Sequence, residues 1–356
     1  MKVQFDIQAI VEDYNQSAAV PFSGAVRFRD AAGQSAERGF GYANRSEQIR
    51  NEPDTRFGIA SGCKIFTAVA ICQLAEQGRL RFEDLLGDVL EQEFPRFDPA
   101  VNVHHLLTHS SGVPDYFDEE VMSDFSELWR KVPAYSIKTP SDFLPLFQDG
   151  AMKFSPGSRF SYCNSGFILL GLIVERLSGQ SFTSYVEEHI FKACGMTDSG
   201  YFAMDRLPER TALGYIDRVD GADGADGAGW RTNHFSLPII GGPDGGAFTT
   251  ARDMEKFWDA LLGNRLLSEE MTSQMLTPHM VVSEKSRYGY GVWMTYMNGE
   301  LFKYYVMGSD PGVTMVSSAY AGAQPGCQLH VLGNIERGAG AISSRIDSAL
   351  AAVRSQ

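Results

Sequence analysis

Residues 57–64 of this 356-residue chain read Phe57-Gly58-Ile59-Ala60-Ser61-Gly62-Cys63-Lys64 and lead into an apolar run that stops at Gly78. This run predicts a helix over residues 64–77, because glycine favours a helix end. Residues three apart lie on one face of a helix, so Lys64 can place its amine beside the Ser61 hydroxyl. A serine becomes a strong nucleophile when a neighbouring base takes its proton, and a lysine of lowered pKa can be that base. The alternative interpretation of this Ser-x-x-Lys motif is a capping serine followed by a surface lysine.

A second short motif, Tyr162-Cys163-Asn164, stands directly before a helix predicted over residues 164–178. A tyrosine close to cations can act as a phenolate or pass a proton on, and an asparagine amide can orient a substrate amide. A turn in which Asn164 caps the helix is the alternative interpretation.

Taken together, these motifs resemble the class C β-lactamase-like serine hydrolases. That family includes penicillin-binding proteins, D-alanyl-D-alanine carboxypeptidases, D-aminopeptidases and esterases. The resemblance runs from about residue 22 to residue 341 and includes four further stretches, which are residues 105–112 (HLLTHSSG), 194–197 (CGMT), 245–253 (GGAFTTARD) and 308–312 (GSDPG). The order and spacing of all these stretches fit the family.

The resemblance implies roles for individual residues of this chain. Ser61 would be acylated, and Lys64 would take its proton or hold it in place. Tyr162 would protonate the leaving group and then help to activate the deacylating water. The backbone N–H groups of Ser61 and Ser309 would form the oxyanion hole. Because the base is disputed in such enzymes, Lys64 and Tyr162 are assigned this role jointly.

On the substrate side, the resemblance implies that Asn164 binds the acyl-side amide and that Gly308 and Ser309 line the substrate site. Members of the family usually carry a lysine or histidine two residues before the glycine of the third motif, where this chain has Val306. A cation there would meet a substrate carboxylate and lower the pKa of the tyrosine. A neutral or ester substrate is therefore favoured over β-lactamase or carboxypeptidase activity, unless Lys303 or Arg287 substitutes for the missing cation.

The distribution of strand-like and helix-like patterns predicts an α+β protein. Strand patterns occur near both ends of the chain, at residues 24–29, 38–43, 55–60, 288–295, 301–307, 313–320 and 328–333. Helical patterns occur at 4–17 and 341–353 and, in the middle, at 103–108, 164–178 and 182–192. We therefore expect a discontinuous α/β sheet domain (1–80 and 216–356) and an inserted, mostly helical domain (81–215). The resemblance implies a β-lactamase-like fold, with an antiparallel sheet flanked by terminal helices and the active site between the two parts.

Composition sets further limits. The chain has 31 basic and 44 acidic residues, a formal charge of −13, which disfavours nucleic-acid and membrane-surface partners. The N-terminus lacks the apolar core of a signal peptide, so a cytoplasmic location is expected. Five cysteines without a paired spacing indicate reduced thiols. His105 and His109 stand four apart but lack an acidic partner, so no metal is predicted. The Asp- and Gly-rich stretch at 220–229 is interpreted as a loop tip and not as a calcium loop.

The leading hypothesis is thus a serine hydrolase that acts through an acyl-enzyme on an ester, an amide or a small peptide, without a cofactor. Its partner would be a small-molecule or peptide substrate, and the sequence indicates no oligomeric state. The alternative is a weak or inactive penicillin-binding-like protein that binds a peptide or a lactam-like ligand, which Val306 motivates. A plain scaffold protein is a third hypothesis and would have a flat surface where these motifs lie.

Overall fold

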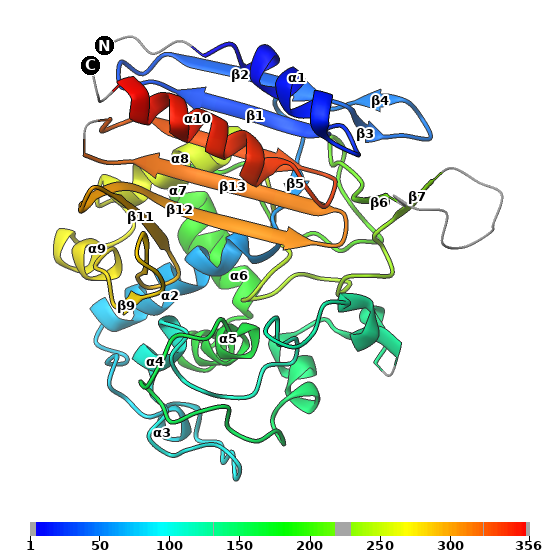
Figure 1. Cartoon of the computed structure of the whole chain (residues 1–356). Coiled ribbons are helices and arrows are strands. Elements are labelled where there is room, and N and C mark those ends of the chain that lie inside the picture. The colour runs from blue at the N-terminus through cyan, green and yellow to red at the C-terminus, as the bar shows by residue number, and fades with distance from the viewer. Residues whose placement is uncertain (1–4, 131, 218–228, 323, 354–356) are drawn as a thin grey trace.

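The computed structural model describes residues 5–130, 132–217, 229–322 and 324–353 (Figure 1). The stretch interpreted as a loop tip, 220–229, lies outside these residues except for its last position. No helix among the described residues is both long enough and apolar enough to cross a membrane.

An antiparallel sheet of eight strands forms the body of the molecule (Figure 1). Across the sheet, the strands are β2 (Ser35–Phe40), β1 (Gly24–Arg29), β14 (Gln328–Gly333), β13 (Val313–Tyr320), β12 (Glu300–Asp310), β11 (Trp293–Met297), β10 (Ser286–Tyr288) and β9 (Met280–Val281). The N-terminal hairpin joins the C-terminal strands where β1 pairs with β14, with Gly24 opposite Gly333. The predicted α+β fold, with a sheet built from both ends of the chain, is confirmed.

Helices cover both faces of this sheet. The terminal helices α1 (Ile7–Ser17) and α10 (Ala339–Val353) lie side by side on one face, where Val11 and Ile346 join a core with Val331 of β14. On the other face, α8 (Ala251–Leu262) packs against β14, and its Trp258 Nε1 donates a hydrogen bond to Ser317 Oγ of β13 at 2.9 Å.

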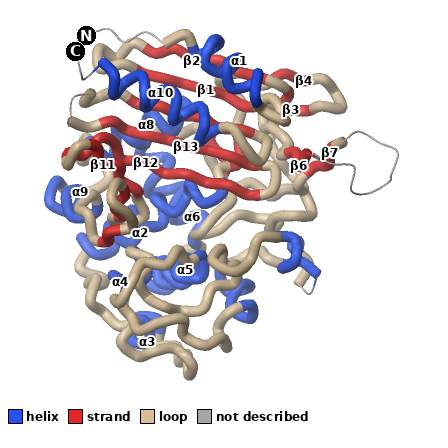
Figure 2. The backbone as a smooth tube through the Cα atoms, viewed as in Figure 1, coloured by secondary structure: helices blue, strands red, loops and turns tan. Residues whose placement is uncertain are grey.

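The helical part of the chain is organised around α2 (Lys64–Glu76), which is apolar on every side and is buried on every side. It packs on α5 (Asn164–Ser178) and α6 (Phe182–Val186), and α5 in turn contacts α3 (Leu86–Leu90) and α4 (Val103–Leu107). Long loops and short turns join these helices (Figure 2). The position of α2 between the sheet and α5 places its first residues at the junction of the two parts.

The remaining elements are short. The strands pair as β3 (Tyr42–Asn44) with β4 (Ile49–Arg50), β5 (Phe57–Gly58) with β8 (Phe248–Thr249), and β6 (Tyr215–Asp217) with β7 (Trp230–Thr232). The remaining helices are α7 (Lys192–Cys194) and α9 (Glu269–Met275), and short stretches of 3-10 helix include Ala60–Cys63, Phe125–Arg130, Ala134–Ser136 and Pro140–Leu146.

Several predicted elements match the structure and several are wrong. The strands at 24–29, 313–320 and 328–333 and the helix at 164–178 are confirmed at both ends. The strand at 288–295 is wrong, because Gly291 takes a left-handed φ of +67° and separates β10 from β11. Gly41, with a φ of +68°, ends the strand expected at 38–43 after Phe40. Of the strand expected at 55–60 only Phe57–Gly58 forms, and the helix at 182–192 contains a π-helical turn at Glu187–Phe191.

Candidate active site

Ser61 lies in a tight turn between the sheet side and the helical side. It belongs to the 3-10 turn Ala60–Cys63, so α2 itself starts one turn later, at Lys64. Ala60, just before it, has a left-handed φ of +45°, a conformation that costs energy for a residue with a side chain. Two backbone hydrogen bonds hold this turn, from Ile59 N to Ala247 O at 2.9 Å and from Gly246 N to Ala60 O at 3.3 Å. The neighbouring segment thus fixes the direction of the Ser61 side chain.

The buried Lys64 amine connects three parts of the site. Its Nζ donates to Ser61 Oγ at 2.9 Å, to Asn164 Oδ1 at 2.8 Å and to the Asp244 carbonyl oxygen at 2.6 Å. The two carbonyl groups can only accept, so they take two N–H bonds whatever the charge of the lysine. The third direction, toward Ser61 Oγ, therefore holds an N–H in the ammonium form and the lone pair in the free amine. In the free-amine form this geometry lets Lys64 receive the Ser61 proton.

Asn164 is held at the start of α5 by contacts with the protein. Besides accepting from Lys64, its side chain donates from Nδ2 to Asp115 Oδ2 at 3.4 Å and to the Phe117 carbonyl at 3.3 Å. Asp115 also accepts from the backbone N–H groups of Asn164 and Ser165, both at 2.9 Å, and so satisfies the free donors of this helix end. Burial raises the pKa of Asp115 to about 6, although these N–H groups oppose the shift. Asn164 thus orients Lys64 and keeps two long, weak contacts on its amide nitrogen.

Tyr162 stands beside Ser61 and Lys64 in an aromatic surrounding. The Lys64 Nζ lies 4.9 Å from the centre of the Tyr162 ring. The ring centre of the buried His109 lies 4.4 Å from the same point. The His109 Nδ1 accepts from the Cys163 N–H at 3.0 Å, so its Nε2 carries the proton and donates to the Tyr288 hydroxyl, 3.1 Å away. Burial raises the pKa of Tyr162 well above 10, and an interaction with Ser61 opposes this only in part. Tyr162 is therefore a neutral phenol in the resting site.

Strand β12 approaches the Ser61 turn very closely at Gly308. A Cβ atom at this position would lie 2.2 Å from Ile59 O, 2.8 Å from Gly62 N and 3.0 Å from Ser61 N. Only glycine fits there, because all three neighbours are backbone atoms. The next residue, Ser309, is exposed and lines the same cavity as Ser61. The backbone groups predicted to form the oxyanion hole are therefore brought to one place.

Val306 supplies no cation, and neither substitute does. The Val306 side chain is buried in the apolar core on the α2 side of the sheet. Lys303 is bound on the opposite face, where its Nζ donates to Asp347 Oδ2 of α10 at 2.7 Å. Arg287 donates from Nη1 to the Ser283 carbonyl at 2.5 Å. Neither residue lines the cavity at Ser61, so among the described residues Lys64 is the cation that reaches Tyr162.

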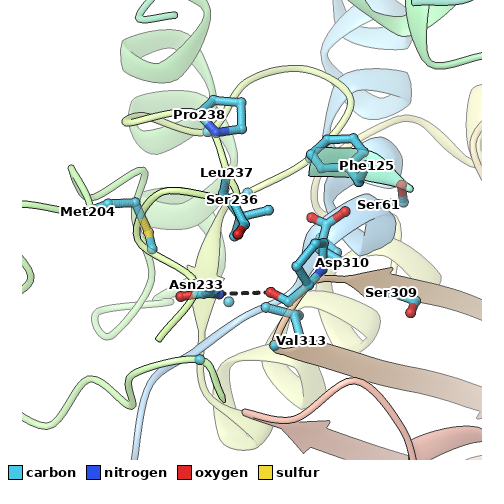
Figure 3. Close-up of a pocket in the computed structure, with 18 of the residues that line it drawn as sticks. Ser61, Phe125, Met204, Asn233, Ser236, Leu237, Pro238, Ser309, Asp310 and Val313 are labelled. Atoms are coloured by element: carbon cyan, nitrogen blue, oxygen red, sulfur yellow. Dashed lines mark hydrogen bonds between the residues drawn. The ribbon is translucent and has the colours of Figure 1, made fainter. Parts of the chain in front are cut away.

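The motifs lie on a cavity of about 390 Å³ and not on a flat surface, which argues against a plain scaffold (Figure 3). Ser61, Asn164, Ser309 and the side chains of Asp244 and Asp310 line it. A cavity of this size fits a small ligand. Figure 3 shows Ser61, Ser309 and Asp310 along one wall, with Met204 and Leu237 on the other side.

The sequence analysis missed four residues at this site. Asp115 and Tyr116 follow the 105–112 stretch by a few positions, and the Tyr116 hydroxyl donates to the carboxylate of Asp244. Burial raises the pKa of Asp244, whose backbone carbonyl holds Lys64. Asp310 stood inside the quoted 308–312 stretch but received no role. A polar residue inside or next to a matched stretch is the signal that could have identified these aspartates, since Asp244 directly precedes the 245–253 stretch.

Other candidates have structural contacts instead. Burial raises the pKa of the Cys63 thiol to about 12, which makes a competing thiolate unfavourable. Trp293 pairs across the strands with Tyr305, with ring centres 6.3 Å apart. His105 Nδ1 accepts from the Asn102 N–H, and the described residues contain no cluster of three metal-ligating side chains.

Comparison with known proteins gives consistent results. Residues 8–322 match the family model described as Beta-lactamase. The Bacillus subtilis (strain 168) protein PbpX, which is named as a penicillin-binding protein, is 28% identical over 79% of this chain. A second penicillin-binding protein of the same strain is 27% identical over 76% of the chain. The chain spans only 64% and 59% of the lengths of these two relatives. The crystal structure of a penicillin-binding protein from Bacillus halodurans is 48% identical, with a TM-score of 0.88, and the match covers 96% of this chain and 99% of that one.

Proposed function

The chain belongs to the beta-lactamase family of serine hydrolases, and on that premise we propose that it hydrolyses an ester, an amide or a small peptide through an acyl-enzyme on Ser61. The observation that carries this proposal is the arrangement at Lys64. Two carbonyl acceptors fix its amine at 2.8 and 2.6 Å, and its remaining direction points at Ser61 Oγ. A purely structural lysine would not need the nucleophile's oxygen as its third partner.

Acylation begins with attack of Ser61 Oγ on the substrate carbonyl carbon. The serine proton moves to the free amine of Lys64, which becomes an ammonium ion. The carbonyl oxygen takes up negative charge beside the backbone N–H groups of Ser61 and Ser309, which favour that charge because they are fixed in advance. When the intermediate collapses, the leaving group takes the phenolic proton of Tyr162. Lys64 is then cationic beside the new phenolate and stabilises it.

Deacylation reverses these proton transfers. The Tyr162 phenolate takes a proton from water, and the hydroxide attacks the ester carbonyl of the acyl-enzyme. Ser61 Oγ leaves with the proton of the Lys64 ammonium. The three side chains return to their starting states, so the cycle consumes one water and needs no metal or cofactor. The raised pKa of Tyr162 fits this order, because its phenolate forms only after Lys64 has gained its charge.

The substrate is proposed to lack a carboxylate next to the scissile bond. The family resemblance leads to the expectation of a cation at position 306, and the buried Val306 there has none. Without that charge, penicillins and peptides with a free C-terminal carboxylate lose a strong partner in the site. Neutral esters and amides lose nothing by this change.

Intact-mass measurement tests the proposal. The protein and its Ser61→Ala variant are incubated with a fluorophosphonate, a series of p-nitrophenyl esters and a penicillin. We expect a covalent adduct that is absent from Ser61→Ala, ester turnover, and little penicillin hydrolysis. Absence of an adduct with every reagent would favour the alternative, a ligand-binding relative silenced by Val306, for which the neutral, buried phenol of Tyr162 is the supporting observation.

A further inference from the structure

The cavity at Ser61 carries an excess of acidic groups. Five carboxylic residues and one arginine line its described part, and the acidic ones are Glu119, Asp124, Asp244, Asp310 and Glu336. Lys64, the cation behind Ser61, is already bound to three acceptors. The local field around the nucleophile therefore favours a positively charged ligand.

Asp310 is the acidic residue whose position is most informative. It is the last residue of β12 and directly follows Ser309, which the proposed function places in the oxyanion hole. Its side chain is half-buried, and within the described part of the chain its carboxylate has neither a hydrogen bond nor an ion pair. A half-buried carboxylate without a partner is costly to ionise, and a ligand that brings a cation relieves this cost.

The charged groups around Asp310 further favour a cationic partner for its carboxylate. Burial, Asp244 and Glu119 together raise the pKa of Asp310 to about 7, while Lys64 lowers it. The Asp244 carboxyl already accepts from Tyr116. The one lining arginine, Arg231, donates to Ser236 Oγ at 2.9 Å and acts on the pKa of Glu336, so it belongs to another part of the wall. Asp310 is therefore a half-buried carboxylate that is still open to a ligand cation, whereas Glu119 is exposed to solvent.

One part of the cavity wall is apolar. Met204, Leu237 and Phe248 form a small cluster there, and Phe125, Phe202 and Leu207 pack against it. These side chains suit a hydrocarbon group of a ligand. A carboxylate at the nucleophile and an apolar lobe beyond it describe a ligand with an amine and an apolar side chain.

We propose that the site selects acyl substrates with a protonated amine next to the scissile carbonyl and an apolar side chain, and that Asp310 binds this ammonium group. Such substrates are the esters and amides of apolar amino acids and short peptides with a free N-terminus. Adjacent residues are about 3.8 Å apart along the chain, so a carbonyl held at Ser309 leaves an α-amino group within reach of Asp310. This inference rests on the proposed acyl-enzyme function and adds the charge of its substrate.

Matched substrates test the inference kinetically. Leucine p-nitroanilide and its N-acetyl derivative differ in the charged amine, and both enantiomers are measured. We expect the free amine to have about tenfold higher kcat/KM, carried mainly by KM, as for a charge-assisted hydrogen bond. Asp310→Asn should lose this preference, so that the ratio of kcat/KM between the free-amine and the N-acetyl substrate falls from about tenfold to about one. Asp149→Asn, which removes an exposed carboxylate outside the cavity, is the charge-matched control.

A pH profile adds a signature that a merely structural role would not move. Between pH 5 and about 7 the amine stays protonated while Asp310 ionises, so KM of the free-amine substrate should fall as the pH rises. Asp310→Asn should show no such fall. An equal loss of kcat on both substrates in Asp310→Asn would overturn the inference in favour of a general-base role. Equal or better turnover of the N-acetyl substrate by the unmodified protein would overturn it as well.

Binding of substrate-like amides to the Ser61→Ala variant tests the amine site independently of catalysis. Leucinamide and N-acetylleucinamide are titrated into this variant by calorimetry, and the same titration is made with Asp310→Asn in the Ser61→Ala background. We expect tighter binding of leucinamide and loss of the difference with Asp310→Asn. If no reagent forms an adduct but leucinamide still binds preferentially, the acyl-enzyme proposal fails and the amine site stands. If both amides bind alike, the amine site fails whatever the outcome for Ser61.

Discussion

Replacement of Gly308 by alanine tests the closest contact in the site. The added Cβ would lie 2.2 Å from the Ile59 carbonyl oxygen, and Gly62 N and Ser61 N are also within 3.0 Å. Carbon–oxygen contacts in proteins are about 3.3–3.6 Å, so strand and turn must separate by about 1 Å. The clashing atoms are all backbone, so no side-chain rotation relieves the overlap. The separation acts directly on the two N–H groups proposed to hold the developing oxyanion.

The size of the effect follows from this displacement. A misplacement of about 1 Å can cost about 100-fold in rate, and loss of one oxyanion donor costs about 10²–10³ in kcat. Overpacking a well-packed region destabilises by about 1–3 kcal/mol. We therefore expect Gly308→Ala to stay folded and to lose 100-fold or more in kcat on a p-nitrophenyl ester, roughly the donor-loss value.

Ester turnover and urea unfolding are measured on the same preparations. Gly62→Ala is the first comparison, because its Cβ would meet the flexible Met315 side chain, with Sδ at 2.7 Å, and should disturb the site less. Gly340→Ala in α10 is the second, since its Cβ meets nothing within 4 Å; it should keep kcat and gain about 0.5–1 kcal/mol. A folded Gly308→Ala protein with unchanged kcat would refute both the close approach and the assigned oxyanion hole.

Three further predictions concern single side chains. Tyr162→Phe should lower the acylation rate with amides by about 10²–10⁴ and the rate of the p-nitrophenolate burst with p-nitrophenyl esters far less, because p-nitrophenolate leaves without a proton; equal losses in the two acylation rates would exclude leaving-group protonation as its role. Lys303→Met should destabilise by about 3–5 kcal/mol in urea, since it leaves Asp347 without its cation, yet kcat should not change; a lower kcat would return Lys303 to the site. Asp115 is an acid with a pKa raised to about 6, so it opposes folding once ionised, and the unmodified protein should lose stability as the pH rises from about 4 to 6. Asp115→Asn should remove that part of the pH dependence, and an unchanged urea profile in the variant would contradict the assignment.

The sequence predicted which side chains meet at Ser61 because those residues are close along the chain. Ser61 and Lys64 are three residues apart, and Tyr162 and Asn164 flank the start of one helix, so local geometry already brings each pair together. The family resemblance then joined the two pairs. The strand errors had local causes that the pattern hides: Gly291 continues an apolar run, yet its left-handed φ breaks the strand.

The sequence alone could have excluded Lys303 as the substitute for the cation missing at position 306. Side chains of a strand alternate between its two faces, so Lys303 and Val306, an odd number of residues apart, lie on opposite sides of β12. The structure has Val306 in the core on the α2 side and Lys303 under α10. Lys303 could therefore have been rejected as the substitute cation as soon as residues 301–307 were predicted to form a strand.

The acidic character of the cavity could not be predicted from the sequence, because its carboxylates come from distant segments of the chain. Glu119, Asp244 and Asp310 meet only after β12 has docked against the Ser61 turn and the loop before α8 has wrapped around Lys64. Their effect depends on this meeting, since the pKa of Asp310 rises through burial and through the other two carboxylates. In the proposed mechanism, Lys64 and Tyr162 activate Ser61, whereas Val306 and Asp310 set the charge that a substrate meets. A relative at 48% identity therefore supports the chemistry of this chain more strongly than its specificity. If Asp310 binds an ammonium group, the site offers no cation at position 306 to a substrate carboxylate and instead offers a carboxylate to a substrate amine.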